Sequence, residues 1–312
     1  MTTVTLSGTP APAPLPARGA LRSPFRRPSR RAGFPRDRLV LPGLRVDLAR
    51  LAAYERACGF APGPDDADAL PVTYPHVLGF PLAMRLMSGR DFPLPLLGLV
   101  HTSIGIVRRT GLPVTGEYEL AVHIAGLAPH RRGTEATVVT ELRAGGDAVW
   151  ESRSTYLARH RTGPGAAPGP GEEPGPREEL GPGKEPGPGK EPRPTLPVAA
   201  EWRLAGDLGR RYGAASGDRN PIHLHPLAAR LFGFPSAVAH GMWTVARCLA
   251  AHGAPEAARI RARFRAPVPL PLPLPLPLPG TVAYGADGTG RFELRGAGDR
   301  PYLTGEVRAP AP

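Results

Sequence analysis

The sequence predicts an α+β fold built as two similar halves, each a layer of helices on an antiparallel sheet. One observation is a tract of repeated Pro-Gly pairs mixed with Glu and Lys, residues 162–195, which cannot bury apolar surface and is typical of a flexible linker. The other is the order of the elements. On each side of the tract, segments with helical spacing of apolar residues precede segments in which apolar and polar residues alternate. We therefore expect folded halves at residues 37–161 and 196–312.

In the first half, local signals mark two helices and three strands. Asp47 can cap a helix that begins at Leu48 and stops at Gly59, and a second apolar helix fits around Phe80–Met87. Strands are expected at Tyr118–Ile124, Ala136–Leu142 and Val149–Leu157. Residues 1–36 are rich in proline, alanine and arginine without periodicity, so we expect a disordered basic tail.

The second half carries the same kinds of signal. Helices are expected between Asp207 and Gly217, from Pro226 to Gly233, and from Gly241 to His252 with Gly253 as the stop. Strands are expected at Arg259–Ala266, Thr281–Tyr284, Arg291–Arg295 and Tyr302–Arg308, with Asp287-Gly288 as a hairpin turn. Proline takes every second place in Pro267–Pro279. Because proline lacks the amide donor of a central strand, this tract is expected to leave the sheet as a polyproline-II loop.

Composition and charge exclude several classes of protein. The net charge of +12 is spread along the chain without a helix-turn-helix, zinc-finger or aromatic RNA-binding signature, so nucleic acid is not an expected partner. No run of about 18 apolar residues occurs, so no membrane span is expected. The two cysteines, Cys58 and Cys248, lie in apolar helical patterns. Both are expected to be free thiols in a reducing compartment, which indicates a cytoplasmic protein.

The segment Tyr212–Thr244 carries the candidate chemistry. An Asn-Pro pair lies between Asp218 and His223 and favours a turn that brings a carboxylate and an imidazole into one space. Such a pair suits general acid–base catalysis on a water molecule. Asn220 can orient either partner. The amide of Gly241, at the start of the next expected helix, can donate to a developing enolate.

Two plainer interpretations stay open for this segment. An aspartate followed by a histidine is commonly a surface turn with a capping carboxylate. Alternatively, His223, His225 and His240 could bind a metal, since zinc sites take three or four such ligands. No second ligand cluster accompanies them, so no metal is expected.

The segment closely resembles the hydratase-2 motif of the MaoC-like (R)-specific enoyl-CoA hydratases and dehydratases. The S-G-D-x-N-P-I-H core of that motif is matched by residues 216–223, and its G-F…A-H-G-M portion by residues 233–234 and 239–242. Segments 74–76, 91–93 and 98–101 look, more loosely, like the N-terminal half of two-domain members. Whether His76 and His101 line the interface between the halves or are simply packed histidines stays open.

The resemblance implies a double hot-dog fold, in which each half wraps a curved antiparallel sheet around a central helix. The first half lacks the D-x-N-P-x-H pattern, so it would be a degenerate hot dog that helps to shape an acyl tunnel, and the second half would be catalytic. The implied reaction is the reversible hydration of trans-2-enoyl thioesters to (3R)-3-hydroxyacyl thioesters, without a cofactor. The substrate would be an acyl-CoA or an acyl-carrier-protein thioester, and the protein a monomeric double hot dog or a homodimer of it. The expected catalytic residues are Asp218, His223, Asn220 and Gly241, and the expected substrate-binding residues include Ser216 and His240.

Two other functions stay open. An acyl-thioesterase of the hot-dog fold would need a carboxylate or another water-activating group on its central helix, where Met242–His252 offers only His252. A noncatalytic acyl-binding protein is disfavoured because Asp218 and His223 are both present.

One expected strand has a charged face. Residues 259–265 alternate arginine with apolar residues, so four arginines share one face of the strand. This face is either the solvated outside of the sheet or a contact for the phosphates of CoA or for an acidic carrier protein, which the planar fork of arginine suits. In the second case Arg261 and Arg263 are substrate-binding residues.

Overall fold

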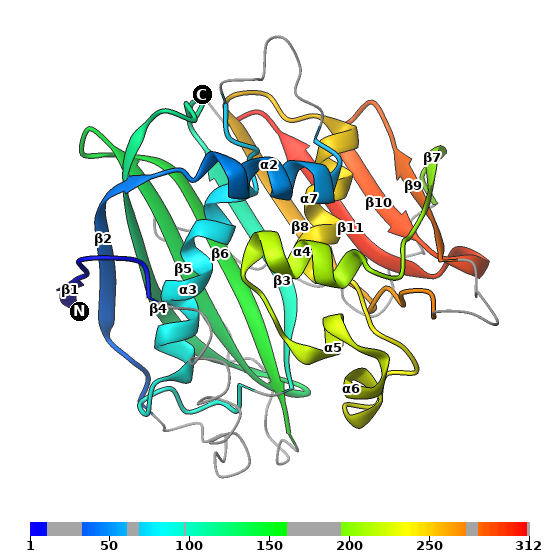
Figure 1. Ribbon diagram of the computed structural model, residues 1–312, viewed down its shortest axis with the longest axis horizontal. Helices are drawn as coiled ribbons and strands as arrows, with labels where there is room; N and C mark the ends of the chain where they lie inside the picture. Colours follow the sequence, from blue (N-terminus) through cyan, green and yellow to red (C-terminus); the bar gives the residue numbers. More distant parts are fainter. Residues whose placement is uncertain (11–32, 61–68, 97, 161–194, 273–279, 311–312) are drawn as a thin grey trace.

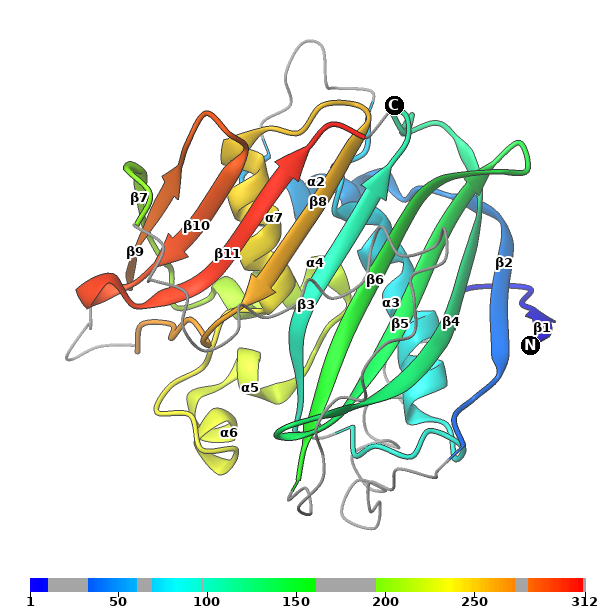
Figure 2. The ribbon, with the colours of Figure 1, turned by 180° about the vertical axis from the view of Figure 1, so that it is seen from behind.

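A single curved sheet forms the back of the molecule, and the helices lie on one of its faces (Figures 1 and 2). The computed structural model describes residues 1–10, 33–60, 69–96, 98–160, 195–272 and 280–310. The strands in these ranges are β1 (Thr2–Thr5), β2 (Asp37–Arg45), β3 (Leu99–Arg108), β4 (Glu117–His130), β5 (Gly133–Ala144), β6 (Asp147–Arg159), β7 (Val198–Arg203), β8 (Ala258–Phe264), β9 (Thr281–Ala286), β10 (Arg291–Arg295) and β11 (Pro301–Arg308). The helices are α2 (Leu48–Cys58), α3 (Tyr74–Ser88), α4 (Leu208–Ser216), α5 (Pro221–Leu224), α6 (Pro226–Leu231), α7 (Gly241–His252) and the 3₁₀ turn η3 (Ala297–Asp299).

The two halves have the same strand order. In the first half the order from the edge is β2-β4-β5-β6-β3, and in the second it is β7-β9-β10-β11-β8. Strands β3 and β8 follow the long helix of their half in sequence and pair antiparallel, with Ser103 opposite Arg263 and Arg108 opposite Ala258. The long helices, α3 and α7, pack on strands of their own halves. This is the double hot-dog fold that the resemblance implies.

Local signals placed several helices correctly. The Asp47 side chain accepts a hydrogen bond from the Arg50 amide (3.1 Å) at the start of α2, and Gly59 ends that helix with φ +76°. Helix α7 spans Gly241–His252, as expected, and Gly253 follows it with φ +77°. These ends are set by capping groups within a few residues, which is why the sequence predicts them.

Helix α3 begins at Tyr74 instead of near Phe80. Pro75 is tolerated in the first turn, where its missing N–H would have no helical partner. All of its residues except Phe80 and Arg85 are buried, so no amphipathic pattern marks the true start. Strand β3 was not among the expected strands for a similar reason, because its last five residues are buried without alternation in the middle of the sheet.

The expectation of a disordered tail is wrong for the first few residues. Strand β1 pairs parallel with β2, and Leu6 is buried behind it. Alternating apolar residues at the terminus can cover the edge of β2, which the composition of the tail as a whole conceals. Residues 11–32 and 161–194 lie outside the described part of the chain, so the linker and the boundaries at 37–161 and 196–312 stay predictions.

The Pro-Leu tract makes one isolated bridge beyond the sheet instead of joining it. The Leu270 amide donates to the Ala237 carbonyl (2.8 Å), and the Ala239 amide donates to the Val268 carbonyl (2.9 Å). Both Leu270 and Val268 are buried. The first part of the tract therefore braces residues 237–239, while residues 273–279 lie outside the described part.

The arginines of β8 lie on the face of the sheet away from the helices. Ile260 and Ala262 belong to the core, and the ring of Phe264 lies against Gly241 of α7. Because successive side chains of a strand point to opposite faces, Arg261 and Arg263 point outward. The structure therefore does not bring these two arginines to the acid–base pair, and it favours the solvated-face interpretation. Within the described ranges, no helix is long and apolar enough to cross a membrane.

Candidate active site

A tight turn between α4 and α5 places Asp218 beside His223. Gly217 ends α4 with φ +82°, a conformation that other residues adopt only with strain. The Asp218 amide then donates to Ser216 Oγ, and the Asp218 carboxylate accepts from the Asn220 amide, each at 3.2 Å. Asn220 Oδ1 in turn accepts from the Ile222 amide (3.3 Å) and caps α5. Ser216 and Asn220 thus shape the turn in this structure, and their expected contacts with substrate stay predictions.

Two glycines of α4 allow the turn to fold back onto the helix. A Cβ on Gly209 would overlap the carbonyl oxygen of His223, and a Cβ on Gly213 would lie 2.8 Å from that of Asp218. The close approach of α5 to α4 therefore requires residues without side chains at both positions. Neither glycine was recognised as functional from the sequence.

His223 is held in one orientation by a backbone carbonyl. Its Nδ1 lies 2.7 Å from the oxygen of Val238, to which it donates, so Nε2 carries the free lone pair. The Val238 amide also donates to the Ile222 carbonyl (3.1 Å), so the backbone of Val238 holds both the His223 ring and α5 in place. Burial lowers the pKa of His223, and the charge of Asp218 opposes that shift. The ring is therefore a neutral base at neutral pH.

His240 supports the pair from behind. Its ring stacks on that of His223, with centroids 3.8 Å apart, and Nε2 donates to the backbone oxygen of Asp218 at 2.9 Å. Burial lowers the pKa of His240 to about 3, so its 4.0 Å approach to the Asp218 carboxylate is not an ion pair at neutral pH. The His240 side chain is only 2% exposed. In this structure it orients Asp218 through the hydrogen bond to the backbone, and its contact with substrate stays a prediction.

Gly241 begins α7 next to this group. The amides of a first helical turn have no partner within the helix, and the helix dipole favours negative charge there. A Cβ on Gly241 would lie 3.0 Å from the ring of Phe264, so only glycine leaves the approach to this turn open. The arrangement suits a donor to an enolate oxygen.

The first half of the chain contributes further side chains that the sequence did not single out as part of the site. Arg50 of α2 donates from Nε to the Ala215 carbonyl (2.7 Å) and from Nη2 to the Ser216 carbonyl (2.8 Å), at the end of α4. Tyr156 of β6 is close enough to Asp218 for that charge to contribute to the rise in its pKa, after the larger effect of burial. No local pattern could have revealed either residue. Arg50 contacts the end of α4, and Tyr156 approaches Asp218, only when the two halves of the chain are folded together.

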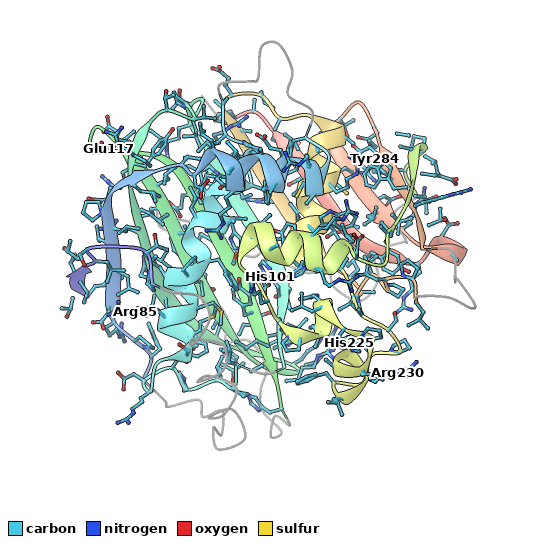
Figure 3. The ribbon with its side chains drawn as sticks, viewed as in Figure 1. Arg85, His101, Glu117, His225, Arg230 and Tyr284 are labelled. Atoms are coloured by element: carbon cyan, nitrogen blue, oxygen red, sulfur yellow. The ribbon has the colours of Figure 1, made fainter. Side chains whose placement is uncertain are left out.

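The structure changes the candidate metal set. His225 lies between α5 and α6 (Figure 3) and caps α6 through its Nδ1, which accepts from the Leu227 amide (3.2 Å). Asp218, His223 and His240 instead have ligand atoms within 4.8 Å of one another. A metal ion lies near the plane of each imidazole that binds it, because the nitrogen lone pair lies in that plane. The rings of His223 and His240 are stacked, with 27° between them, so they do not fit one ion.

Comparisons with known proteins show which family the chain belongs to. The family model described as the MaoC-like domain matches residues 185–274, which include Asp218, His223 and Gly241. A 3-hydroxyacyl-thioester dehydratase X from Mycobacterium tuberculosis is 36% identical over 281 residues, covering 88% of this chain and 90% of that protein. The chain belongs to the MaoC-like dehydratase family.

Solved structures of MaoC-like proteins have the same fold. A crystal structure of HtdX from Mycobacterium tuberculosis superposes with a TM-score of 0.68 at 32% identity, covering 88% of this chain and all of that one. A MaoC-like dehydratase from Phytophthora capsici gives a TM-score of 0.66 at 18% identity, covering 89% and 96% of the two chains. The second likeness shows the fold alone, which persists although most side chains differ.

Proposed function

We propose that this MaoC-like protein is a hydro-lyase that interconverts (3R)-3-hydroxyacyl thioesters and trans-2-enoyl thioesters with loss or gain of water. The observation that carries the proposal is the pairing of Asp218 with a His223 ring whose Nδ1–H is fixed on Val238, so that Nε2 is available as a base. The surface-turn interpretation does not account for the His223 ring, which is held between the Val238 carbonyl and the ring of His240. The M. tuberculosis relative, a 3-hydroxyacyl-thioester dehydratase, supports the same reaction class.

In the hydration direction, His223 Nε2 takes a proton from a water molecule while the oxygen forms a bond to C3. The π electrons of the conjugated thioester move to its carbonyl oxygen, which the amide of Gly241 stabilises as an enolate. Asp218 enters this step as the carboxylic acid and delivers its proton to C2. His223 then returns the proton that it took from water to the Asp218 carboxylate, so that water has been added and both residues are restored. Water addition to a conjugated thioester needs only proton transfer and charge stabilisation, so no cofactor is required.

The thioesterase alternative lacks a suitable group on the central helix. Besides Arg247 and the buried thiol of Cys248, whose pKa burial raises, the titratable group on this helix is His252. Its Nδ1 lies 3.0 Å from the Tyr284 hydroxyl while its ring packs on Phe292. With a rise of 1.5 Å per residue, the far end of this 12-residue helix is about 16 Å from Gly241. A hydrolytic water at His252 would be remote from the enolate site.

The test follows crotonyl-CoA in two assays on the same samples. Loss of enoyl-thioester absorbance without release of thiol reports hydration, and appearance of free CoA thiol reports thioester hydrolysis. We expect hydration that survives dialysis against a chelator and falls about 10²–10⁴-fold in Asp218→Asn and in His223→Gln, with unchanged circular dichroism. Loss of absorbance matched one for one by release of thiol would establish a thioesterase, and binding with neither signal would establish an acyl-binding protein.

The same proposal includes the thioester carrier, the oligomeric state and the cellular location. The thioester carrier is CoA or an acyl carrier protein, and the functional unit is a monomeric double hot dog or a homodimer of it. A cytoplasmic location is supported by Cys58 and Cys248, which are both free and buried, as expected in a reducing compartment.

A further inference from the structure

Two histidines of the first half lie beside the acid–base pair, and the proton transfers described above do not use them. His76 lies in α3 and His101 in β3, and their rings stack with centroids 6.1 Å apart and 14° between the planes. His101 also packs on Tyr156 at 4.5 Å and on Phe264 at 4.6 Å. Phe264 is the residue whose ring lies against Gly241. Figure 3 shows His101 near the centre of the molecule, where the two halves meet, so the pair lies next to the reacting centre.

Each of these histidines has an unused hydrogen-bonding atom. His76 is 9% exposed and its Nδ1 is buried without a hydrogen-bond partner among the described residues. In the same part of the chain, His101 Nε2 is likewise buried without a partner. Leaving a polar atom buried and unpaired is unfavourable, and such atoms in native proteins commonly have a functional reason.

The protonation state of the pair restricts what it can bind. Burial lowers the pKa of His101 well below its usual range and lowers that of His76 to about 4, so both are neutral at neutral pH. The His101 ring also hydrogen-bonds the backbone of Ser103. Since Nε2 is unpartnered, that bond comes from Nδ1–H, and Nε2 is a pure acceptor that needs an O–H or N–H donor. No hydrogen bond of this kind fixes the tautomer of His76 among the described residues, so its ring can donate an N–H.

We propose that His76 and His101 form a subsite for a hydroxyl group on the acyl chain beyond C3, so that the preferred substrates are hydroxylated acyl thioesters. This inference rests on the proposed function. A hydroxyl can donate to His101 Nε2 and accept from His76 at the same time. A methylene group would leave both nitrogens unpaired, and a keto oxygen could accept from His76 but could not donate to His101.

The first test compares substrates on the wild-type protein. Hydration of trans-2-hexenoyl-CoA is compared with that of its 4-, 5- and 6-hydroxy derivatives and of the 5-oxo derivative. We expect kcat/KM for at least one hydroxylated substrate to exceed that of the unsubstituted one by about tenfold or more, since a site built to bind a hydroxyl discriminates against analogues that lack it. The 5-oxo substrate should gain less. A ratio near one for every hydroxylated substrate would overturn the subsite even where hexenoyl-CoA is hydrated well.

Variants then locate the preference. His101→Phe keeps an aromatic ring in the stack but removes the acceptor, and it should bring the hydroxylated-to-plain ratio of kcat/KM to near one. His101→Gln, which restores an acceptor at similar reach, should recover part of the ratio. His130→Phe is the matched control, because His130 lies at the β4–β5 hairpin, where its ring accepts from the Arg132 amide. The control should keep both the ratio and the basal rate, and an equal loss of the ratio in the control would overturn the assignment.

A binding measurement separates this inference from the proposed function. Saturated 4-, 5- and 6-hydroxyhexanoyl-CoA and hexanoyl-CoA can bind but cannot be hydrated, so their dissociation constants do not depend on catalysis. Tighter binding of a hydroxylated thioester that His101→Phe or His76→Phe abolishes supports the subsite even in a protein that hydrates nothing. Equal dissociation constants for all four ligands on the wild-type protein would overturn it, whether or not the variants fold.

Discussion

Replacement of Arg50 by methionine should impair catalysis from a distance. The Arg50 guanidinium belongs to α2 of the first half and holds the carbonyls of Ala215 and Ser216, 2.7 and 2.8 Å away, at the end of α4. These are the last residues before Gly217 and Asp218. A cation at a helix C-terminus also interacts favourably with the helix dipole. Arg50→Met keeps the aliphatic stem but removes both hydrogen bonds, so the turn that carries Asp218 loses its anchor.

The magnitude follows from the two bonds. Hydrogen bonds to a charged group contribute about 1.5–3 kcal/mol each, and part of this is recovered when solvent reaches the half-buried position. We expect a loss of about 2–4 kcal/mol, which for a chain of this size lowers Tm by roughly 5–10 °C. Displacement of a catalytic group by about 1 Å can cost about 100-fold in rate, so kcat should fall about 10–100-fold while KM changes little. Thermal unfolding and crotonyl-CoA hydration measure the two effects.

Arg45→Met is the matched control, five residues earlier in the chain. Arg45 pairs with Glu117 at 2.7 Å, but the two side chains are 76% and 57% exposed. Exposed ion pairs of this kind contribute less than about 1 kcal/mol. If Arg50→Met and Arg45→Met show the same kcat and the same Tm, the guanidinium of Arg50 does not position Asp218 and the reasoning fails.

Three further predictions concern the neighbouring residues. The pKa of His76 is about 4 in the folded protein against 6.5 when unfolded, so the unfolded chain binds the proton first and stability is lost as pH falls from 6.5 towards 4. This corresponds to about 3 kcal/mol. Between pH 7.5 and pH 4.5 the free energy of unfolding measured with urea should therefore fall by about that much less in His76→Phe than in the wild type. The lowered pKa values of His101, His223 and His240 cost stability in the same direction in both proteins, so only the difference between the two reports on His76. Gly241→Ala should lower kcat about tenfold, because the added Cβ lies 3.0 Å from Phe264, and Phe264→Leu in the same chain should restore part of it; no rescue would argue against the steric cause. Arg261→Gln should leave KM for the thioester within about twofold because its side chain lies on the outer face of the sheet. A large rise in KM that disappears at high salt would instead establish contact with the phosphates.

Much of the site could be predicted from the sequence because its chemistry is local. Asp218, Asn220 and His223 lie within one turn, and the hydrogen bonds that shape it join residues two apart. The position of the Gly241 amide could be predicted as well, because the residues that begin and end its helix can be recognised in the sequence. Neighbouring residues therefore carry both the pattern and the geometry. The same spacing put His225 into the alternative metal set, because spacing alone cannot say which way a ring points.

The sequence by itself determined most of the helix ends, most of the alternating strands and the α+β order repeated in two halves, and it singled out Asp218 and His223 as the candidate acid–base pair. Only the tertiary structure decided that Arg50 holds the end of α4, that His76 and His101 stand beside the pair, and that the β8 arginines face outward. The physical reason is that periodicity reports which side of an element is buried but not what it is buried against. Arg50 and Ala215 are 165 positions apart, and their contact exists only because β3 and β8 join the two halves into one sheet.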